Sequence, residues 1–392
     1  MTPAARVQAA IEVLDAVISA AKAGGAPADR LVSEYFRARR YAGSKDRRAV
    51  RELIYRAIRA CGSVPSSGRS AMLRLAELDP AIALLFDGSA HGPAPIAAEE
   101  RAAVGGVAPD WLLAKLSHSG VEAAEADALL GRAPLDLRVN TLKADRETLE
   151  LPVAAENTAA PHGLRIDAGT AVEQWDAFRN GAIEVQDTGS QLACVAVEAM
   201  PGETIFDLCA GGGGKTLSLA AAMENRGRLL ATDTDRARLS KLTPRAERAG
   251  AGMIETRLLD PGKELEALAD VHEAADAVLV DAPCSGTGTW RRNPEARWRL
   301  TEERLKRFTE TQARLMDIAS TLVRPGGRMV YVTCSLLDAE GADQIARFLA
   351  GNPNWSAEPV DLPLGGQRGQ GWRLSPFHDG TDGFFIARLS RA

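Results

Sequence analysis

Apolar residues recur at helical spacing through the first third of the chain. In segments 9–18, 48–62 and 70–78, apolar side chains lie three and four positions apart, and runs of β-branched residues are few. This spacing places the apolar side chains of each segment on one helix face. The pattern predicts an all-helical N-terminal domain over residues 1–130.

The pattern of apolar and polar residues changes between residues 131 and 202. Segment 135–143 alternates apolar and polar residues, as a half-buried strand does, and segments 162–169 and 182–187 are similar. Segment 143–150 is expected to form a short helix between the first two strands. Together these elements predict a small α+β subdomain.

From residue 203 onward, short apolar runs alternate with longer segments of helical periodicity, which is typical of a parallel, doubly wound sheet. Strands are predicted at 204–209, 228–233, 254–259, 277–282, 328–334 and 383–389, the last as an antiparallel edge strand. Helices are predicted at 215–223, 235–250 (interrupted by Pro244), 301–323 and 338–351. Residues 203–392 are therefore expected to form an α/β, Rossmann-like domain.

Charge changes this picture only locally. The 392-residue chain has a formal net charge of −5, which argues weakly against a nucleic-acid partner. Segment 35–59, however, contains nine Lys or Arg and two acidic residues, with Tyr41 and other aromatic residues interleaved. Such a composition suits an RNA backbone with nearby bases, although a solvated helix face is the simpler alternative.

No apolar run reaches the length of a membrane helix, and the N-terminus lacks the pattern of a signal peptide. We therefore expect a cytoplasmic protein without a membrane partner. The five cysteines are widely spaced, without a CxxC pair or a histidine cluster, so no metal site is expected. Cys61 and Cys194 are interpreted as small core residues.

The stretch DLCAGGGGKT, residues 207–216, resembles a phosphate-binding loop at first sight. A P-loop needs a glycine six residues before its lysine, but Cys209 stands six residues before Lys215. A dinucleotide fingerprint would need its third glycine at Thr216. Both nucleotide classes therefore fit poorly.

An adenosine ligand without a phosphate fits better. The loop follows a strand and opens a helix, where free amides and glycines let a ligand approach closely. Asp233 ends the next strand, 22 residues after Gly211, and is placed to bind both ribose hydroxyls. Asp260 follows the third strand and can accept a hydrogen bond from the adenine amine. S-adenosylmethionine is the adenosine ligand that this pattern favours.

Cys284 and Cys334 both follow apolar strands, at the sheet edge that carries ligands in open α/β folds. A thiolate that adds to carbon 6 of a pyrimidine makes carbon 5 nucleophilic enough to accept a methyl group. A carboxyl group near ring nitrogen 3 would stabilise the charge that develops, and Asp281 is placed for this role. The alternative for Asp281 is an acid that caps a turn.

The chain resembles the Nop/Sun (Fmu-like) family of RNA cytosine-5 methyltransferases, and its bacterial RsmB-like branch in particular. The resemblance covers roughly residues 131–392. It is carried by the stretches LRVNTLK, VQDTGSQL, DLCAGGGGKT, DAPCSGTGTWRRNPEARW, YVTCSLLDAEG and DGFFIARL. It implies a class I methyltransferase fold with a mostly parallel seven-stranded sheet, S-adenosylmethionine as cofactor, and RNA as substrate.

The resemblance also implies roles for single residues. Cys334 would be the nucleophile, Cys284 would assist release of the methylated RNA, and Asp281 would bind the cytosine ring. The cofactor would be held by Cys209, Ala210, Gly211, Gly212, Gly213, Gly214, Lys215, Asp233, Asp260 and Asp281. The RNA backbone would be held by Arg291, Arg292 and Asn293.

One position departs from the family. Gly212 stands where the family loop usually has proline, which raises the entropy cost of ordering the loop and is expected to weaken cofactor affinity at most. Residues 1–130 resemble a NusB-like RNA-binding domain only loosely. We expect a monomer that methylates ribosomal RNA; the same chemistry on transfer RNA and a non-catalytic RNA-binding scaffold are the alternatives. An ATP hydrolase and an amine methyltransferase are disfavoured by the missing glycine and by the two thiols.

Overall fold

The computed structural model describes all residues, 1–392, and the chain divides into two compact units. The first consists of Met1–Gly131 and Thr289–Thr301, and the second of Arg132–Gly288 and Glu302–Ala392. Segment Thr289–Thr301 was expected inside the Rossmann-like domain and belongs instead with the helical residues. The division of the remaining chain at residue 202 stays a prediction.

The first unit is helical and has its own core. Each of its longer helices buries a stripe of apolar side chains, as their three- and four-residue spacing predicted. Its helices are α1 (Pro3–Ala23), α2 (Ala28–Ala38), α3 (Ser44–Ala60), α4 (Gly68–Leu78), α5 (Pro80–Ala83), α6 (Asp110–His118), α7 (Ala123–Ala128) and α14 (Ala296–Arg299).

Hydrogen bonds explain why α14 belongs to the helical unit. The guanidinium of Arg297, which is fully buried, donates to the carbonyls of Ile58 (2.7 Å) and Cys61 (2.9 Å) at the end of α3. The indole of Trp298 donates to the same Cys61 carbonyl at 3.2 Å. The last carbonyls of a helix have no partner within it, so these side chains satisfy them.

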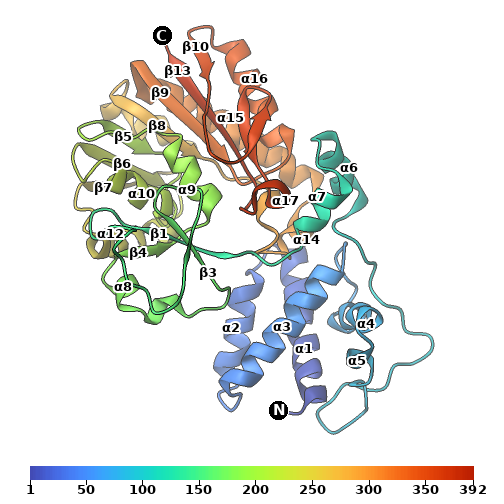
Figure 1. The fold of residues 1–392 in the computed structure, drawn as a ribbon. Coiled ribbons are helices and arrows are strands. Elements are labelled where there is room, and N and C mark those ends of the chain that lie inside the picture. Colours follow the sequence, from blue (N-terminus) through green and yellow to red (C-terminus); the bar gives the residue numbers. More distant parts are fainter. The chain divides into compact units, whose positions relative to one another are not determined.

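The second unit is built on a nine-stranded sheet with the order β11-β12-β13-β9-β8-β5-β6-β7, in which β10 also pairs with β13 (Figure 1). The strands β7, β6, β5, β8 and β9 are parallel, and the others join them antiparallel. Their bounds are β5 (Thr204–Asp207), β6 (Arg228–Asp233), β7 (Ile254–Leu258), β8 (Ala275–Asp281), β9 (Val323–Thr333), β10 (Trp355–Glu358), β11 (Gly366–Arg368), β12 (Gly371–Leu374) and β13 (Phe384–Arg391).

The Rossmann-like architecture is confirmed, but two details of the sheet were predicted wrongly. The resemblance implied seven strands and the sequence pattern predicted six, whereas the sheet has nine. The pattern missed β10, β11 and β12, which are short and show no apolar alternation. The strand β13 is antiparallel as expected, but it lies inside the sheet, paired with β9 on one side and with β12 and β10 on the other. Its mostly buried side chains agree with this interior position.

A separate antiparallel sheet with the order β2-β3-β1-β4 forms in the region of the predicted α+β subdomain. The helix expected at 143–150 is absent, and turns take its place. The Asp145 carboxylate accepts a hydrogen bond from the N–H of Glu147 at 2.8 Å, a local bond that competes with helix formation. The strands are β1 (Leu135–Val139), β2 (Glu156–Asn157), β3 (Gly163–Ile166) and β4 (Ile183–Val185).

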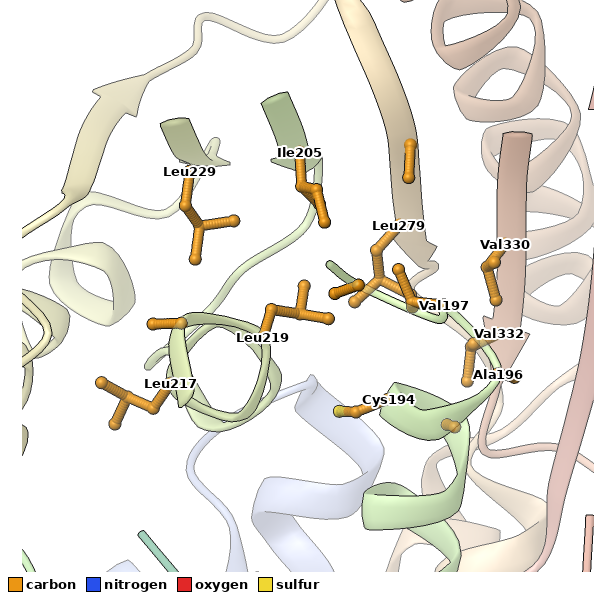
Figure 2. Close-up of a cluster of buried hydrophobic side chains, with 14 of the residues drawn as sticks. Cys194, Ala196, Val197, Ile205, Leu217, Leu219, Leu229, Leu279, Val330 and Val332 are labelled. Carbon is orange, nitrogen blue, oxygen red and sulfur yellow. The ribbon is translucent and has the colours of Figure 1, made fainter. Parts of the chain in front are cut away.

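Helices cover both faces of the inner parallel strands, whose alternate residues point to opposite faces. Ile205 and Leu279 pack with α9 and α10 on one face (Figure 2), and Phe206 and Val278 pack with α15 and α16 on the other. The helices of this unit are α8 (Asp176–Arg179), α9 (Thr188–Val195), α10 (Gly214–Ala222), α11 (Arg236–Leu239), α12 (Leu242–Ala249), α13 (Glu264–Ala267), α15 (Glu302–Leu322), α16 (Ala342–Gly351) and α17 (Pro376–Asp379).

The predicted break in helix 235–250 separates α11 from α12, a few residues before Pro244. Cys61 and Cys194 are buried in the cores of the two units, as expected. None of the helices is both long and apolar enough to span a lipid bilayer.

Candidate active site

The strand order fixes where a ligand can bind in the second unit. From β5 the chain proceeds to β6 and β7 on one side, and then crosses over to β8 and β9 on the other. The loops that follow β5 and β8 therefore leave the sheet in opposite directions and open a crevice at its carboxyl edge. The glycine loop follows β5, and the stretch with Cys284 follows β8.

Two positions of the glycine loop have backbone conformations that favour glycine. Gly211 (φ 55°) and Gly213 (φ 85°) have left-handed backbones. A Cβ on Gly211 would lie 2.3 Å from Nη2 of Arg238, and a Cβ on Gly213 would lie 2.1 Å from Cδ1 of Leu242. Gly213 caps α10, whose first-turn amides have no carbonyl partner within the helix.

Asp233, at the end of β6, holds this loop in place. Its Oδ2 accepts the N–H of Gly211 at 2.7 Å, and its Oδ1 accepts the N–H of Asp235 at the same distance. Each carboxylate oxygen can accept a second hydrogen bond. Asp233 therefore shapes the loop and still has acceptor capacity for a pair of hydroxyl groups.

Lys215 links the glycine loop to the opposite side of the crevice. Its ammonium lies 2.7 Å from Oδ2 of Asp281, at the end of β8, and 5.5 Å from the centre of the Phe384 ring. A cation in the first turn of α10 opposes the helix dipole, so the Asp281 carboxylate compensates for an otherwise unfavourable position. Burial lowers the pKa of Lys215, but Asp281, together with Cys194 and Cys334, more than offsets this effect, and the net pKa is raised.

The two cysteines at the strand ends lie in contact. The Sγ atoms of Cys284 and Cys334 are 3.3 Å apart, and both residues are partly exposed. The hydrogen bond to Cys334, burial, and the charges of Cys334 and Glu340 raise the pKa of Cys284 well above its usual value. Burial likewise raises the pKa of Cys209.

A cavity of about 300 Å³ brings five of the twelve predicted catalytic and cofactor-binding residues together. The predicted residues that line it are Cys209, Asp233, Asp281, Cys284 and Cys334. Asp260 is exposed and lies outside this lining, whereas Leu259 and Glu264 of the same region line it. An adenine contact of Asp260 thus stays a prediction.

Three buried carboxylates at this edge were not anticipated from the sequence. Asp207, at the end of β5, accepts the hydroxyl of Thr216 at 2.7 Å, and burial raises its pKa to about 7 against that bond. Glu264 lies in the cavity wall and accepts Arg314 at 2.6 Å. Glu340 lies next to both cysteine loops. A usable signal for Glu340 was the repeated Cys-Ser pair, since each serine binds it.

The residues proposed to contact RNA lie in the helical unit. In segment 35–59, the hydroxyls of Tyr35 and Tyr55 donate to Glu12 and Asp29, whereas Tyr41 is 76% exposed. In the 291–293 stretch, Arg291 is buried, Arg292 is partly exposed and Asn293 is exposed. Binding of RNA by either segment stays a prediction.

The residues at the crevice fit S-adenosylmethionine. The glycine loop has open space beside Gly214, where an added Cβ would meet no atom within 4 Å. Asp233 offers acceptors for ribose hydroxyls, and Lys215 is paired with Asp281. No group of three or more His, Cys, Asp or Glu side chains is arranged to hold a metal ion.

Comparison with known proteins agrees with this geometry. Residues 194–390 match the family described as 16S rRNA methyltransferase RsmB/F. The ribosomal RNA small subunit methyltransferase B of Xylella fastidiosa is 36% identical over 290 residues, which cover 72% of this chain and 68% of the relative. The enzyme of the same name from Pasteurella multocida is 32% identical over 292 residues, covering 72% and 65%.

Two solved structures share the fold of this chain. The crystal structure of PH0851 superimposes with a TM-score of 0.76 at 26% identity, over 100% of this chain and 99% of that one. NSun6 from Pyrococcus horikoshii, solved with SFG, has a TM-score of 0.61 at 19% identity over 71% of this chain and 97% of its own. The second likeness concerns the fold alone.

Proposed function

Because the chain belongs to the 16S rRNA methyltransferase RsmB/F family, we propose that it transfers a methyl group to carbon 5 of a cytosine in ribosomal RNA. The observation that carries this proposal is the contact of the Cys284 and Cys334 thiols, 3.3 Å apart in one cavity with Asp281. A methyltransferase for an amine needs no thiol, and two are present. S-adenosylmethionine supplies the methyl group when bound.

The proposed chemistry uses the thiols in sequence. The thiolate of Cys334 forms a bond to carbon 6 of the ring, and carbon 5 then bonds to the methyl group as the bond from that group to the sulfonium sulfur breaks. A base takes the carbon 5 proton, the electron pair of that bond restores the 5,6 double bond, and the bond from carbon 6 to sulfur breaks to release the Cys334 thiolate. Cys284, in contact with Cys334, assists this release.

Asp281 is proposed to hold the ring from the other side. A carboxyl group beside ring nitrogen 3 stabilises the charge that appears there as the thiolate adds. The Lys215 ammonium, 2.7 Å away, fixes the position of that carboxyl group. Asp233 and the glycine loop hold the cofactor, with the methyl donor between the loop and the cysteines.

Ribosomal RNA is preferred over transfer RNA as substrate, because the relatives are named for the small ribosomal subunit. The non-catalytic scaffold is disfavoured by the intact thiol pair and by the Lys215–Asp281 ion pair. The helical unit and its basic segment 35–59 are proposed to bind the RNA.

The first test is methyl transfer from labelled S-adenosylmethionine to bacterial ribosomal RNA and subunits, followed by nucleoside analysis. We expect labelled 5-methylcytidine from the parent protein, and a loss of at least about 10³-fold for Cys334→Ala. Label in another nucleoside, or none in any RNA, would contradict the proposal.

The second test separates the two cysteines. Cys284→Ala is expected to leave RNA attached through Cys334, visible as a slowly migrating band on a denaturing gel. The double variant Cys284→Ala/Cys334→Ala is the control and should show no band. Normal turnover of Cys284→Ala without an adduct would exclude its role in release.

A further inference from the structure

A fully buried carboxylate lies directly beneath the two cysteine loops. Glu340 belongs to a short 3-10 turn, Asp338–Glu340, that follows β9. Its Oε1 accepts the backbone N–H of Ser285 at 2.8 Å and the side-chain amide of Gln312 at 3.1 Å. Its Oε2 accepts the hydroxyls of Ser285 and of Ser335, the latter at 2.6 Å.

These bonds join two segments that are 50 residues apart in the sequence. Ser285 directly follows Cys284, and Ser335 directly follows Cys334, so one carboxylate holds the residue next to each thiol. The two serine hydroxyls are 3.3 Å apart, the same separation as the two sulfur atoms. Thiols are weak donors and acceptors, so their own attraction does not impose this contact.

The carboxylate is itself fixed to the sheet and to a helix. The carbonyl of Glu340 accepts the hydroxyls of Tyr331 (2.8 Å) and Thr333 (3.2 Å), which belong to β9. The amide of Gln312, on α15, also donates to the carbonyl of Pro283 at 2.9 Å, one residue before Cys284. The network therefore has rigid supports on both sides of the thiol pair.

A buried carboxylate is costly unless donors surround it, and four donors meet Glu340. An apolar residue would fill the same space without this desolvation cost. What the carboxylate adds is a specific arrangement of the two cysteine loops. The two thiols must act on adjacent carbons of one ring, where an error of about 1 Å is expected to cost roughly 10²-fold in rate.

We propose that Glu340 is a positioning residue that clamps the loops of Cys284 and Cys334 so that both thiols meet one base. This inference rests on the proposed function, but its geometric part is independent of any RNA. The negative charge of Glu340 also contributes to the raised pKa of Cys284. The clamp thus acts on position first and on charge second.

The two effects are separable by substitution. Glu340→Ala removes every acceptor of the clamp. Glu340→Gln retains an oxygen for the Ser285 N–H and Gln312, and its amide can donate to serine hydroxyls that rotate to accept. Asp276→Asn and Asp276→Ala are matched controls: Asp276 accepts the N–H of Thr204 at 2.7 Å at the opposite, amino end of the same sheet.

The first readout is the rate at which diamide joins the two thiols, followed by peptide mapping. Diamide takes two electrons and two protons from the pair, forms the Cys284–Cys334 disulfide and becomes the hydrazine. We expect Glu340→Ala to slow this reaction by roughly 10- to 100-fold, and Glu340→Gln and both Asp276 variants to stay within about threefold of the parent. Thermal melts check that each variant is folded; if Glu340→Ala does not fold, Ser285→Ala/Ser335→Ala takes its place.

The second readout is methyl transfer at saturating cofactor. We expect Glu340→Ala to lower kcat by about 10- to 100-fold and to leave the Kd for S-adenosylmethionine within about twofold. A folded Glu340→Ala protein with the parent's rate of disulfide formation overturns the clamp. If Glu340→Ala slows disulfide formation but the parent protein methylates no RNA, the clamp is supported and the proposed function is contradicted.

Discussion

The two walls of the crevice are built by different means. The wall after β5 is one continuous stretch, Cys209–Lys215, and is shaped by backbone: left-handed glycines and a loop amide held by Asp233. The wall after β8 and β9 is shaped by buried side chains that come from several segments and meet at Glu340. The residues of a wall that backbone shapes are contiguous in the sequence, whereas the residues of a side-chain network are spread along it.

Asp281 lies where the two walls meet, and among the substitutions that test this comparison Asp281→Asn has the largest expected effect. Asp281→Asn keeps an acceptor for Lys215 but removes the charge that compensates a cation at the start of α10. We expect kcat to fall by about 10²- to 10³-fold, and the Kd for S-adenosylmethionine to change by less than about tenfold. Single-turnover methylation and calorimetry measure the two quantities. Asp276→Asn is the control. If the kcat of Asp281→Asn stays within threefold of the parent, Asp281 is not needed for the chemistry.

The contrast between the walls also explains what could be predicted from the sequence. The glycine loop, Asp233 and the strand-end positions of Cys284 and Cys334 are recognisable because each lies next to a strand in a contiguous motif. The cavity lining bears out the clustering of these strand ends. Glu340 was missed because its partners Ser285 and Gln312 are 55 and 28 residues away, and only the fold brings them together.

The same reasoning applies to the fold. The strands β5, β6, β8 and β9 could be recognised in the sequence because both of their faces are largely apolar. The strands β11 and β12 were not, because a polar, glycine-containing hairpin is held by pairing with β13 rather than by its own pattern. The helix expected at 143–150 does not form for a local reason: the Asp145 carboxylate accepts the N–H of Glu147 and stabilises a turn.

Substitution of Gly213 tests the wall that follows β5, Cys209–Lys215, which we call the backbone wall. Gly213→Ala would strain a backbone at φ 85° and place its Cβ 2.1 Å from Leu242. We expect a loss of stability of about 2–3 kcal/mol and a Kd for S-adenosylmethionine raised at least about tenfold. Calorimetry and thermal denaturation measure both. Gly214→Ala is the matched control for stability, because its Cβ meets no atom within 4 Å and alanine favours the helix. Equal melting temperatures for the two variants would contradict this account.

Asp207 makes the stability of the backbone wall dependent on pH. Its folded-state pKa is raised from 3.8 to about 7, chiefly by burial. Because the folded state holds this proton more tightly than the unfolded chain, the stability from the protonated form is complete below about pH 4 and is lost as pH rises through 7.

Asp207→Asn should remove this dependence, because an amide stays neutral and can still accept the Thr216 hydroxyl. Relative to the parent, its Tm should rise by roughly 5 °C between pH 5.5 and pH 8. Melting curves at matched ionic strength measure the difference. A constant difference across this range would show that Asp207 does not titrate there, and Asp276→Asn controls for loss of a carboxylate elsewhere.

Gly212 offers the smallest and most favourable change. Its φ lies outside the left-handed region, its N–H donates to no backbone carbonyl, and an added Cβ would lie 3.5 Å from Nη1 of Arg245, an ordinary contact. The Gly212 carbonyl accepts a hydrogen bond from Arg245, and proline would keep it. Gly212→Pro should therefore restrict the free loop by about 0.4–1 kcal/mol and tighten cofactor binding roughly two- to fivefold. Gly212→Ala, which fixes φ less firmly, should show a smaller gain. If Gly212→Pro, but not Gly212→Ala, binds S-adenosylmethionine more weakly than the parent, the restriction that proline places on the backbone of Gly211 outweighs the benefit of a less flexible free loop.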